Sequence, residues 1–145
     1  MPKAYVDSGV LIKLYVREPN SATAAAIVQA IPAVPLTPLH ELEIRNTLSA
    51  LVGSGAITQS QRAASEHTFD VDITAGRLHR TVPDWDAVFL RSRELAATHT
   101  AETLARSLDV LHVAMADLST DVFVTADKRR AAIARRVGLE VRFVE

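Results

Sequence analysis

Cysteine is absent from the 145 residues of this chain. Its absence excludes disulfide bonds, zinc sites built on thiolates and cysteine nucleophiles. Long apolar runs are absent as well, because none approaches the ~20 residues of a membrane-spanning helix. The N-terminal residues lack the basic and apolar pattern of a signal peptide. We therefore expect a cytoplasmic protein with no membrane partner.

Several sequence motifs of known chemistry are also missing. The five histidines form no H-E-x-x-H pair, and we expect His112 to be a packed core residue. The chain has neither G-x-S-x-G nor G-x-x-x-x-G-K-[ST], so an esterase and a P-loop enzyme are both unsupported. Asp7 is followed by Ser8 and Gly9, whereas an aspartate-nucleophile phosphatase would carry a second Asp two residues on. Acidic residues remain as the candidates for chemistry.

Charge of one sign does not dominate the chain, since the formal net charge is -1. This balance argues against general binding to a polyanion, but the basic residues are unevenly placed. Three of them, Lys128, Arg129 and Arg130, directly follow Asp127. We expect these three side chains to contact the phosphates of a substrate, and the alternative is a solvated helix face.

Short apolar segments alternate with helical patterns along the whole chain, without a repeat or a linker. The predicted strands are residues 3–6, 33–36, 77–82, 121–125 and 140–144, and the predicted helices are residues 9–16, 21–31, 38–52, 59–73, 84–98, 108–118 and 127–137. We predict that residues 1–145 form one domain, a three-layer α/β/α sandwich with a mainly parallel central sheet. Right-handed crossovers put the carboxyl ends of such strands on one edge, where Asp7 and Asp127 would emerge.

Particular residues mark where the predicted helices begin. Ser8, Thr37 and Thr58 are placed to cap the helices that follow them. Pro38 stands at the first position of its helix, where no amide hydrogen is needed. In the helix that starts at residue 84, we expect Phe89 to face the core.

Four carboxylates lie where a strand gives way to a helix or just inside that helix. Taken singly, Asp7, Asp109 and Asp127 are explained by the preference of acids for helix starts. Glu43 is harder to explain, because it lies a full turn inside its helix, where an unpaired carboxylate beside apolar neighbours is costly. Glu41 is the competing residue, but it lies nearer the helix start.

Taken together, the four carboxylates predict a metal site. Gathered at one edge of a parallel sheet, they would repel each other unless a cation neutralised them. An all-oxygen ligand set favours Mg²⁺ or Mn²⁺ over zinc. Such an ion activates a bound water and neutralises charge on a phosphoryl group. The pattern therefore predicts metal-dependent hydrolysis of phosphodiester bonds.

At these residues the chain resembles the PIN-domain family, and within it the VapC-type toxin ribonucleases. The resemblance runs from Ala4 nearly to the C-terminus and is most specific in YVDSGVLIKLYVREP, SLDVLHVAMA and FVTADKRRAAIARRVGL. Gly9 departs from the family pattern, in which a small hydroxyl residue is usual after Asp-Ser. The family's acids and nearby hydroxyl fall on Asp7, Glu43 (in LEIRNTL), Asp109, Asp127 and Thr125.

The resemblance implies an endoribonuclease that uses Mg²⁺ or Mn²⁺. The implied metal ligands and catalytic residues are Asp7, Glu43, Asp109 and Asp127, and the implied contacts to the RNA substrate come from Ser8, Thr125, Lys128, Arg129 and Arg130. It also implies a homodimer and a protein antitoxin. An antitoxin arginine could fork onto the carboxylates and compete with the metal.

Two other functions remain open from the sequence. One is a non-enzymatic signalling module, such as a phospho-acceptor receiver domain, which shares the alternating architecture and an acidic pocket. A receiver needs an Asp after a central strand, where this chain has Thr37. The other is a PIN fold that binds RNA without cutting it, which the presence of all four acids disfavours.

Overall fold

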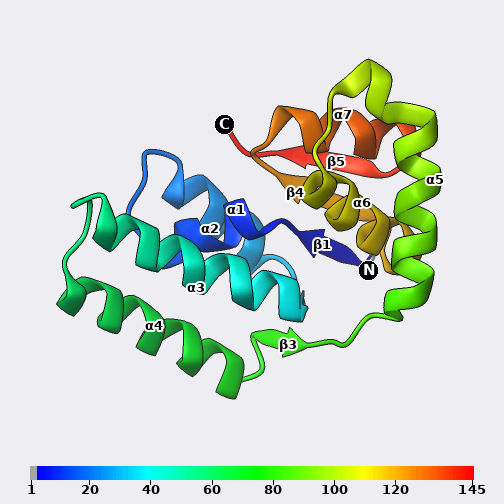
Figure 1. The fold of residues 1–145 in the computed structure, drawn as a ribbon. Helices are drawn as coiled ribbons and strands as arrows, with labels where there is room; N and C mark the ends of the chain where they lie inside the picture. Colours follow the sequence, from blue (N-terminus) through cyan, green and yellow to red (C-terminus); the bar gives the residue numbers. More distant parts are fainter. Residues whose placement is uncertain (1–2) are drawn as a thin grey trace. The chain divides into compact units, whose positions relative to one another are not determined.

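The computed structural model describes residues 3–145, which form two units, each built around its own parallel strands (Figure 1). The first unit contains residues 3–7 together with Pro83–Glu145, and the second is Ser8–Val82. Both units alternate strands with helices, so the prediction of an α/β fold with parallel strands is confirmed. The predicted strands pair as one group of three and one group of two.

The sheet of the first unit has the order β1-β4-β5, with β4 in the middle. Its strands are β1 (Ala4–Val6), β4 (Val122–Thr125) and β5 (Glu140–Phe143), and all pairings are parallel. Every residue of β1 and β4 is buried, which explains why both strands are continuous apolar runs rather than alternating ones. Val6 pairs with Val124, so the chain leaves β1 and β4 side by side at the same edge.

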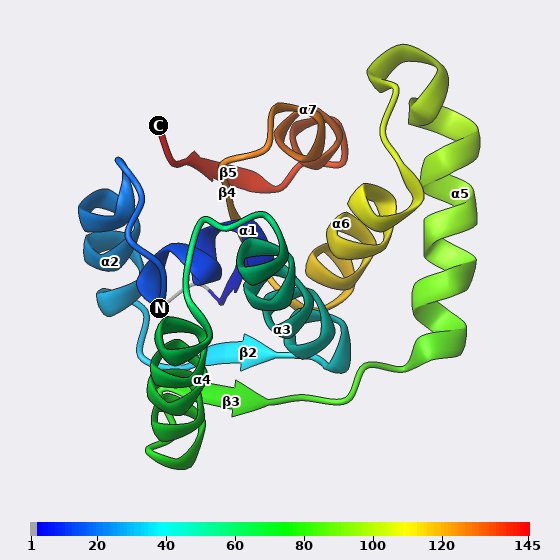
Figure 2. The same ribbon diagram turned by 60° about the vertical axis from the view of Figure 1, so that its left-hand side comes forward.

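Three helices accompany this sheet, namely α5 (Trp85–Thr103), α6 (Ser107–Ser119) and α7 (Lys128–Arg136). Helix α6 contacts both α5 and β4, and α7 contacts β4 and β5 (Figure 2). Helix α5 runs about a turn beyond its predicted end and stops at Leu104, which has a left-handed backbone. The expectation for Phe89 is wrong, since 54% of that residue is exposed.

His112 lies in the core of the first unit, as expected. It is fully buried, and its Nδ1 lies 2.6 Å from the Tyr5 hydroxyl. Tyr5 also stacks on Phe123, with ring centroids 5.7 Å apart and planes 7° from parallel. The hydrogen bond satisfies two polar groups that would otherwise be buried at a cost, so His112 serves packing on α6.

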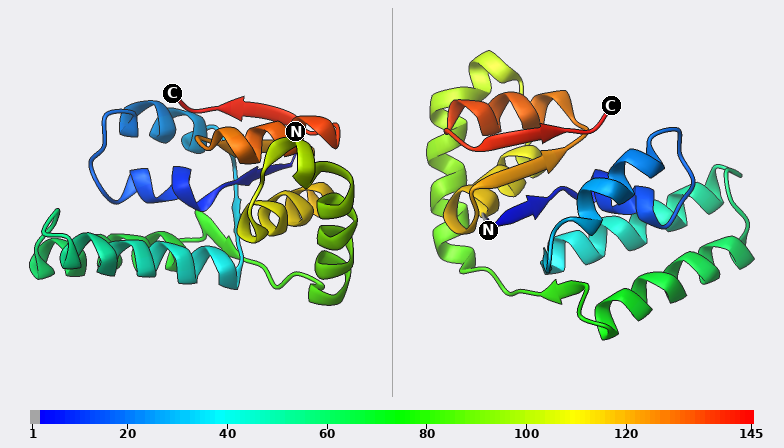
Figure 3. Two further views of the ribbon diagram at one scale, coloured as in Figure 1. Left: turned by 45° about the horizontal axis from the view of Figure 1, so that its top comes forward. Right: turned by 180° about the vertical axis from the view of Figure 1, so that it is seen from behind.

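The second unit contains two paired strands and four helical segments. Strands β2 (Val34–Leu36) and β3 (Leu78–Arg80) are parallel, and the helical segments are α1 (Ser8–Leu11) with the 3-10 turn η1 (Ile12–Leu14), α2 (Ser21–Gln29), α3 (Pro38–Gly53) and α4 (Gln59–Thr74). Figure 3 shows α3 and α4 running alongside each other. The predicted single helix over residues 9–16 is thus shorter and ends in a tighter turn.

Two of the three predicted helix caps of this unit are confirmed. The hydroxyl of Thr37 accepts a hydrogen bond from the amide of His40, and that of Thr58 accepts one from the amide of Gln61. Pro38 stands at the start of α3, as predicted. The cap expected at Ser8 is wrong, because Ser8 is itself the first residue of α1 and its hydroxyl has another partner.

Within residues 3–145, no helix is both long and apolar enough to cross a membrane.

Candidate active site

Two of the four predicted acids emerge where neighbouring strands end. Asp7 follows β1, and its amide donates to the Val124 carbonyl of β4 over 2.9 Å. Thr125 ends β4, and its hydroxyl donates to Oδ2 of Asp7 over 2.8 Å. The same hydroxyl accepts from the amide of Asp127 over 3.0 Å. The parallel register therefore joins Asp7, Thr125 and Asp127 at one edge, as the sequence predicts.

Asp109 reaches this edge from the first turn of α6. Its Oδ2 accepts a hydrogen bond of 2.8 Å from the amide of Arg106, just before the helix. An acid here is favoured both by the free amide and by the helix dipole. Asp109 is nevertheless 5% exposed and Asp7 only 1% exposed, so the site holds two buried carboxylates.

Arg130 bridges these two carboxylates. Its Nε donates to Oδ1 of Asp109 over 2.7 Å, and its Nη1 donates to Oδ1 of Asp7. The Arg130 side chain is 12% exposed. Burying two acids side by side is costly unless a cation with good hydrogen-bond geometry meets them. Arg130 is that cation in the described geometry, and it reaches inward rather than out to solvent.

Asp127 is exposed and caps α7. Its Oδ1 accepts from the amides of Arg129 and Arg130 over 2.8 Å and 3.0 Å. The helix therefore begins directly after Asp127, and Arg130 occupies its first turn. Helical side chains lean toward the N-terminus of their helix, and for Arg130 that direction leads to the sheet edge. The position of Arg130 in the first turn of α7 therefore indicates, from the sequence, that its side chain points inward. The prediction that Arg130 contacts phosphates overlooks this signal.

The fourth predicted acid, Glu43, lies in the second unit on α3. Its Oε1 accepts a 3.0 Å hydrogen bond from the Ser8 hydroxyl. Glu41, the competing residue, accepts from Arg80 through both oxygens, over 3.0 Å to Nη2 and 3.2 Å to Nε. A forked arginine pair of this kind accounts for Glu41 as a structural residue. Glu43 instead meets the residue that directly follows Asp7 in the chain.

An open depression of about 830 Å³ adjoins the acids in the first unit. It is lined by the start of α6, including Asp109, and by the start of α7. Lys128 and Arg129 line it as well, and both residues are exposed. The depression thus combines the buried carboxylate of Asp109 and the exposed one of Asp127 with cations that are accessible to an anion, which is suitable for a phosphate-bearing substrate.

The donor set of this edge fits a hard divalent cation. Asp7 and Asp109 offer carboxylate oxygens, the ligands that Mg²⁺ and Mn²⁺ prefer. Across residues 3–145, no three side chains of His, Cys, Asp or Glu are arranged to hold an ion. The type of ligand thus suits a metal, but in the described geometry the Oδ1 atoms of Asp7 and Asp109 accept from Arg130.

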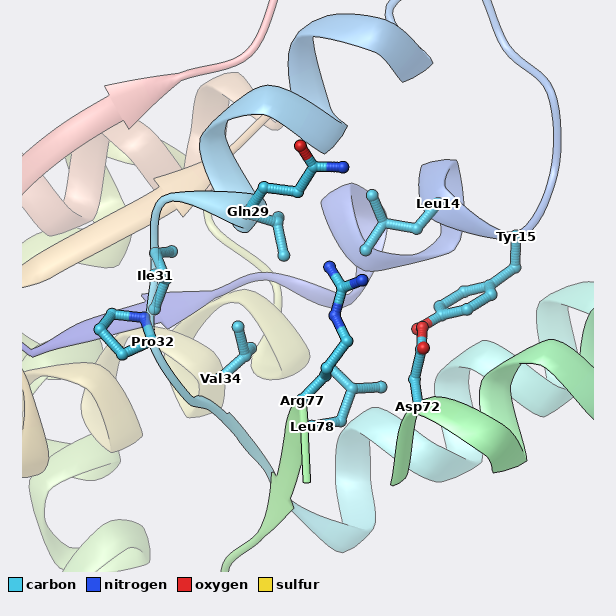
Figure 4. Close-up of a pocket in the computed structure, with 10 residues that line it drawn as sticks. Leu14, Tyr15, Gln29, Ile31, Pro32, Val34, Asp72, Arg77 and Leu78 are labelled. Carbon is cyan, nitrogen blue, oxygen red and sulfur yellow. The ribbon is translucent and has the colours of Figure 1, made fainter. Parts of the chain in front are cut away.

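A second pocket, of about 310 Å³, lies within the second unit (Figure 4). The Tyr15 hydroxyl donates to Oδ2 of Asp72 over 2.7 Å, and Arg77 extends into the pocket beside apolar side chains. Burial raises the pKa of Tyr15 above its ordinary value of 10.0, and the hydrogen bond to Asp72 adds to the rise. Asp72 is the acid that lines this pocket, and its hydrogen bond to the Tyr15 phenol indicates a structural link between the residue that follows η1 and helix α4.

Comparisons with known proteins bear on the whole chain. A model of the PIN domain matches residues 4–136. The crystal structure of FitAcB from Neisseria gonorrhoeae is similar, with a TM-score of 0.68 at 19% sequence identity and 96% coverage of both chains. At this identity, the structural likeness shows the fold alone. No curated protein sequence matches the chain.

Replacing Thr125 with Val is expected to destabilise the first unit. Valine keeps the shape but leaves Oδ2 of buried Asp7 without a donor and the Asp127 amide without an acceptor. The free energy of unfolding should fall by about 2 kcal/mol, measured by urea denaturation. Thr125→Ser keeps the hydroxyl and is the matched control. Equal stability of the Val and Ser variants would show that the hydroxyl does not support Asp7.

Tyr15 is expected to make stability fall at alkaline pH. The unfolded chain releases the phenolic proton near pH 10.0, whereas the folded chain retains it because its pKa is raised. The folded state then binds more protons, so the unfolding free energy decreases as pH rises above that value. Tyr15→Phe should cost about 1 kcal/mol at neutral pH and make the alkaline loss shallower. The measurement is urea denaturation of the original protein and of Tyr15→Phe at a series of alkaline pH values. A parallel loss of stability in the two proteins would contradict the role given to Tyr15.

Proposed function

The chain belongs to the PIN domain family, and from that premise we propose that it is a metal-dependent endoribonuclease, the toxin of a VapC-type toxin–antitoxin pair. PIN domains are generally nucleases. The observation that carries the proposal is the pair of buried carboxylates, Asp7 and Asp109, of which Asp109 lines a depression with exposed cations. Because the family match includes parts of both units, we further propose that residues 1–145 act as one PIN domain.

In this proposal Asp7, Asp109, Asp127 and Glu43 hold Mg²⁺ or Mn²⁺. The ion would lower the pKa of a bound water and offset charge on the phosphoryl group. Glu43 is included because its partner Ser8 is covalently joined to Asp7. Thr125 fixes the direction of the Asp7 carboxylate by donating to Oδ2, and Ser8 does the same for Glu43. Each hydroxyl thus orients one proposed metal ligand within the described geometry.

Lys128 and Arg129 are proposed to bind the RNA backbone. Both are exposed at the start of α7 and line the depression. Cations at these positions attract phosphates regardless of base sequence. The sequence predicts the same role for Arg130, but its guanidinium donates to Asp7 and Asp109 and could bind phosphate only after leaving them.

A protein antitoxin and a homodimer are the proposed protein partners. The exposed apolar side chain of Phe89 lines a groove of about 290 Å³ between α5 and α6. Leu104, which follows α5, and Leu108 on α6 are exposed as well. Exposed apolar surface of this kind marks contact sites for other proteins. Family membership gives no support to a receiver-type signalling module, whereas RNA binding without cleavage remains an outcome of the test below.

Incubation with a total RNA pool is the direct test of this function. In the presence of Mg²⁺ or Mn²⁺, the protein should cut RNA at internal positions, and a chelator should abolish the cutting. Asp7→Asn keeps the size of the side chain but removes an ionic ligand, so cleavage should fall by at least about 100-fold. Circular dichroism would verify that the variant is folded. Full activity of Asp7→Asn, or cleavage that survives the chelator, would contradict the proposal, and binding without cleavage would indicate a non-catalytic PIN protein.

Glu43→Gln and Glu41→Gln form a matched pair on one helix. The first should reduce cleavage by at least about 100-fold, because a proposed ligand loses its charge. The second should leave cleavage within a few-fold of the original, because Glu41 is held by Arg80. Rates measured with one labelled RNA at saturating Mn²⁺ would compare them. Loss at Glu41 alone, or equal loss at both positions, would exclude Glu43 as the helical ligand.

A further inference from the structure

We infer that Arg130 competes with the divalent ion for the carboxylates of Asp7 and Asp109, so that Arg130 sets how tightly the site takes up its metal. The inference rests on the proposed function, since it concerns the same acids. It adds a residue that acts on metal binding through the ligands rather than as one of them.

The oxygens of the two acids are all engaged in the described geometry. Oδ2 of Asp7 accepts from the Thr125 hydroxyl, and Oδ2 of Asp109 accepts from the Arg106 amide. Both remaining Oδ1 atoms accept from the Arg130 guanidinium. The Thr125 and Arg106 donors belong to a buried strand end and to the backbone, whereas Arg130 is a long side chain that can rotate away. Arg130 is therefore the exchangeable donor.

Because both are cations, Arg130 and the divalent ion can hardly bind the same carboxylate oxygens at the same time. One guanidinium between two carboxylates leaves the pair with one net negative charge, and a divalent ion in its place would leave none. Two cations on the same buried oxygens would repel each other, and burial strengthens that repulsion. Arg130 and the ion thus satisfy the same electrostatic need and cannot both occupy these oxygens at low cost.

The backbone aims Arg130 at this place. Its amide is held by the Asp127 cap, which fixes the residue in the first turn of α7. Arg129 is bound to the same cap through its own amide, but its side chain lies exposed in the depression. Arg129 and Arg130 therefore carry the same charge within one helical turn, but of these two side chains only Arg130 binds Asp7 and Asp109.

A consequence follows for substrate binding. An Arg130 released by the ion would stand beside Lys128 and Arg129 at the depression. Metal uptake would then supply one more cation for phosphate at the site where the ion acts. Metal binding and RNA binding would be coupled in the same direction.

Mn²⁺ binding to the RNA-free protein tests the inference. Free Mn²⁺ is measured by electron paramagnetic resonance in titrations of the original protein, Arg130→Gln and Arg129→Gln. Arg130→Gln should bind Mn²⁺ about tenfold more tightly or better, because the competing cation is gone. Arg129→Gln removes the same charge nearby and should stay within about twofold, since its contribution is only a screened surface effect. Unchanged or weaker Mn²⁺ binding by folded Arg130→Gln would overturn the inference.

Thermal unfolding supplies the second measurement. In chelator, Arg130→Gln should melt below the original protein, because two buried carboxylates lose their cation. Added Mn²⁺ should raise the melting temperature of Arg130→Gln more than that of the original protein, since tighter binding stabilises more. If Arg130→Gln is unfolded in chelator, Mn²⁺ is expected to restore the fold, and failure to do so would contradict the competition. The conservative variant Arg130→Lys should lie between the two in Mn²⁺ affinity, because it keeps the charge but not the fork.

The two proposals fail separately. Mn²⁺ affinity that depends on Arg130 in a protein that cuts no RNA would overturn the nuclease proposal alone. Mn²⁺-dependent cleavage by a protein whose Mn²⁺ affinity is indifferent to Arg130 would overturn this inference alone.

Discussion

The need for a cation beside two buried carboxylates organises the edge where β1 and β4 end. Asp7 and Asp109 are 1% and 5% exposed, so water cannot screen their repulsion well. The guanidinium of Arg130 meets both. The surrounding hydrogen bonds serve this arrangement, because Thr125 and the Arg106 amide take up the remaining oxygens. The structure shows this acid pair with a guanidinium as its cation, and under the proposed function a metal ion would take that place.

The parallel sheet determines which side chains can meet there. Val6 pairs with Val124, and the next residue on each strand is Asp7 on one and Thr125 on the other. A shift of one residue would turn Asp7 to the opposite face of the sheet and away from the Thr125 hydroxyl. The apolar runs of β1 and β4 specify this register because both strands are buried throughout. The packing of β1 and β4 in the core of the first unit therefore positions the acids at the sheet edge.

Local patterns in the sequence predicted the features that depend on neighbouring residues. Residues a few positions apart are enough to predict the helix caps at Thr37 and Thr58. They also predict the first-turn position of Asp109 and the strands that precede Asp7 and Asp127. For Arg130, the first-turn position in α7 indicates that the side chain turns towards the sheet edge, but no local pattern predicts its partner Asp7, which lies 123 residues away. Periodicity also placed Phe89 inward, but half-buried helix positions depend on which neighbour covers them. The cap predicted at Ser8 is wrong because Ser8 itself begins α1 and its hydroxyl donates to Glu43, 35 residues on.

The internal arginine changes what an inhibitor of the proposed toxin must do. An arginine inserted by an antitoxin would have to displace Arg130 in the metal-free protein, exchanging one guanidinium for another with little gain in charge neutralisation. Electrostatics at the acids would then contribute little to the affinity of the complex. The binding free energy would have to come from apolar burial, for which Phe89, Leu104 and Leu108 are exposed. The arginine contact would instead decide specificity, because a forked donor fits only where two carboxylates stand at the right spacing.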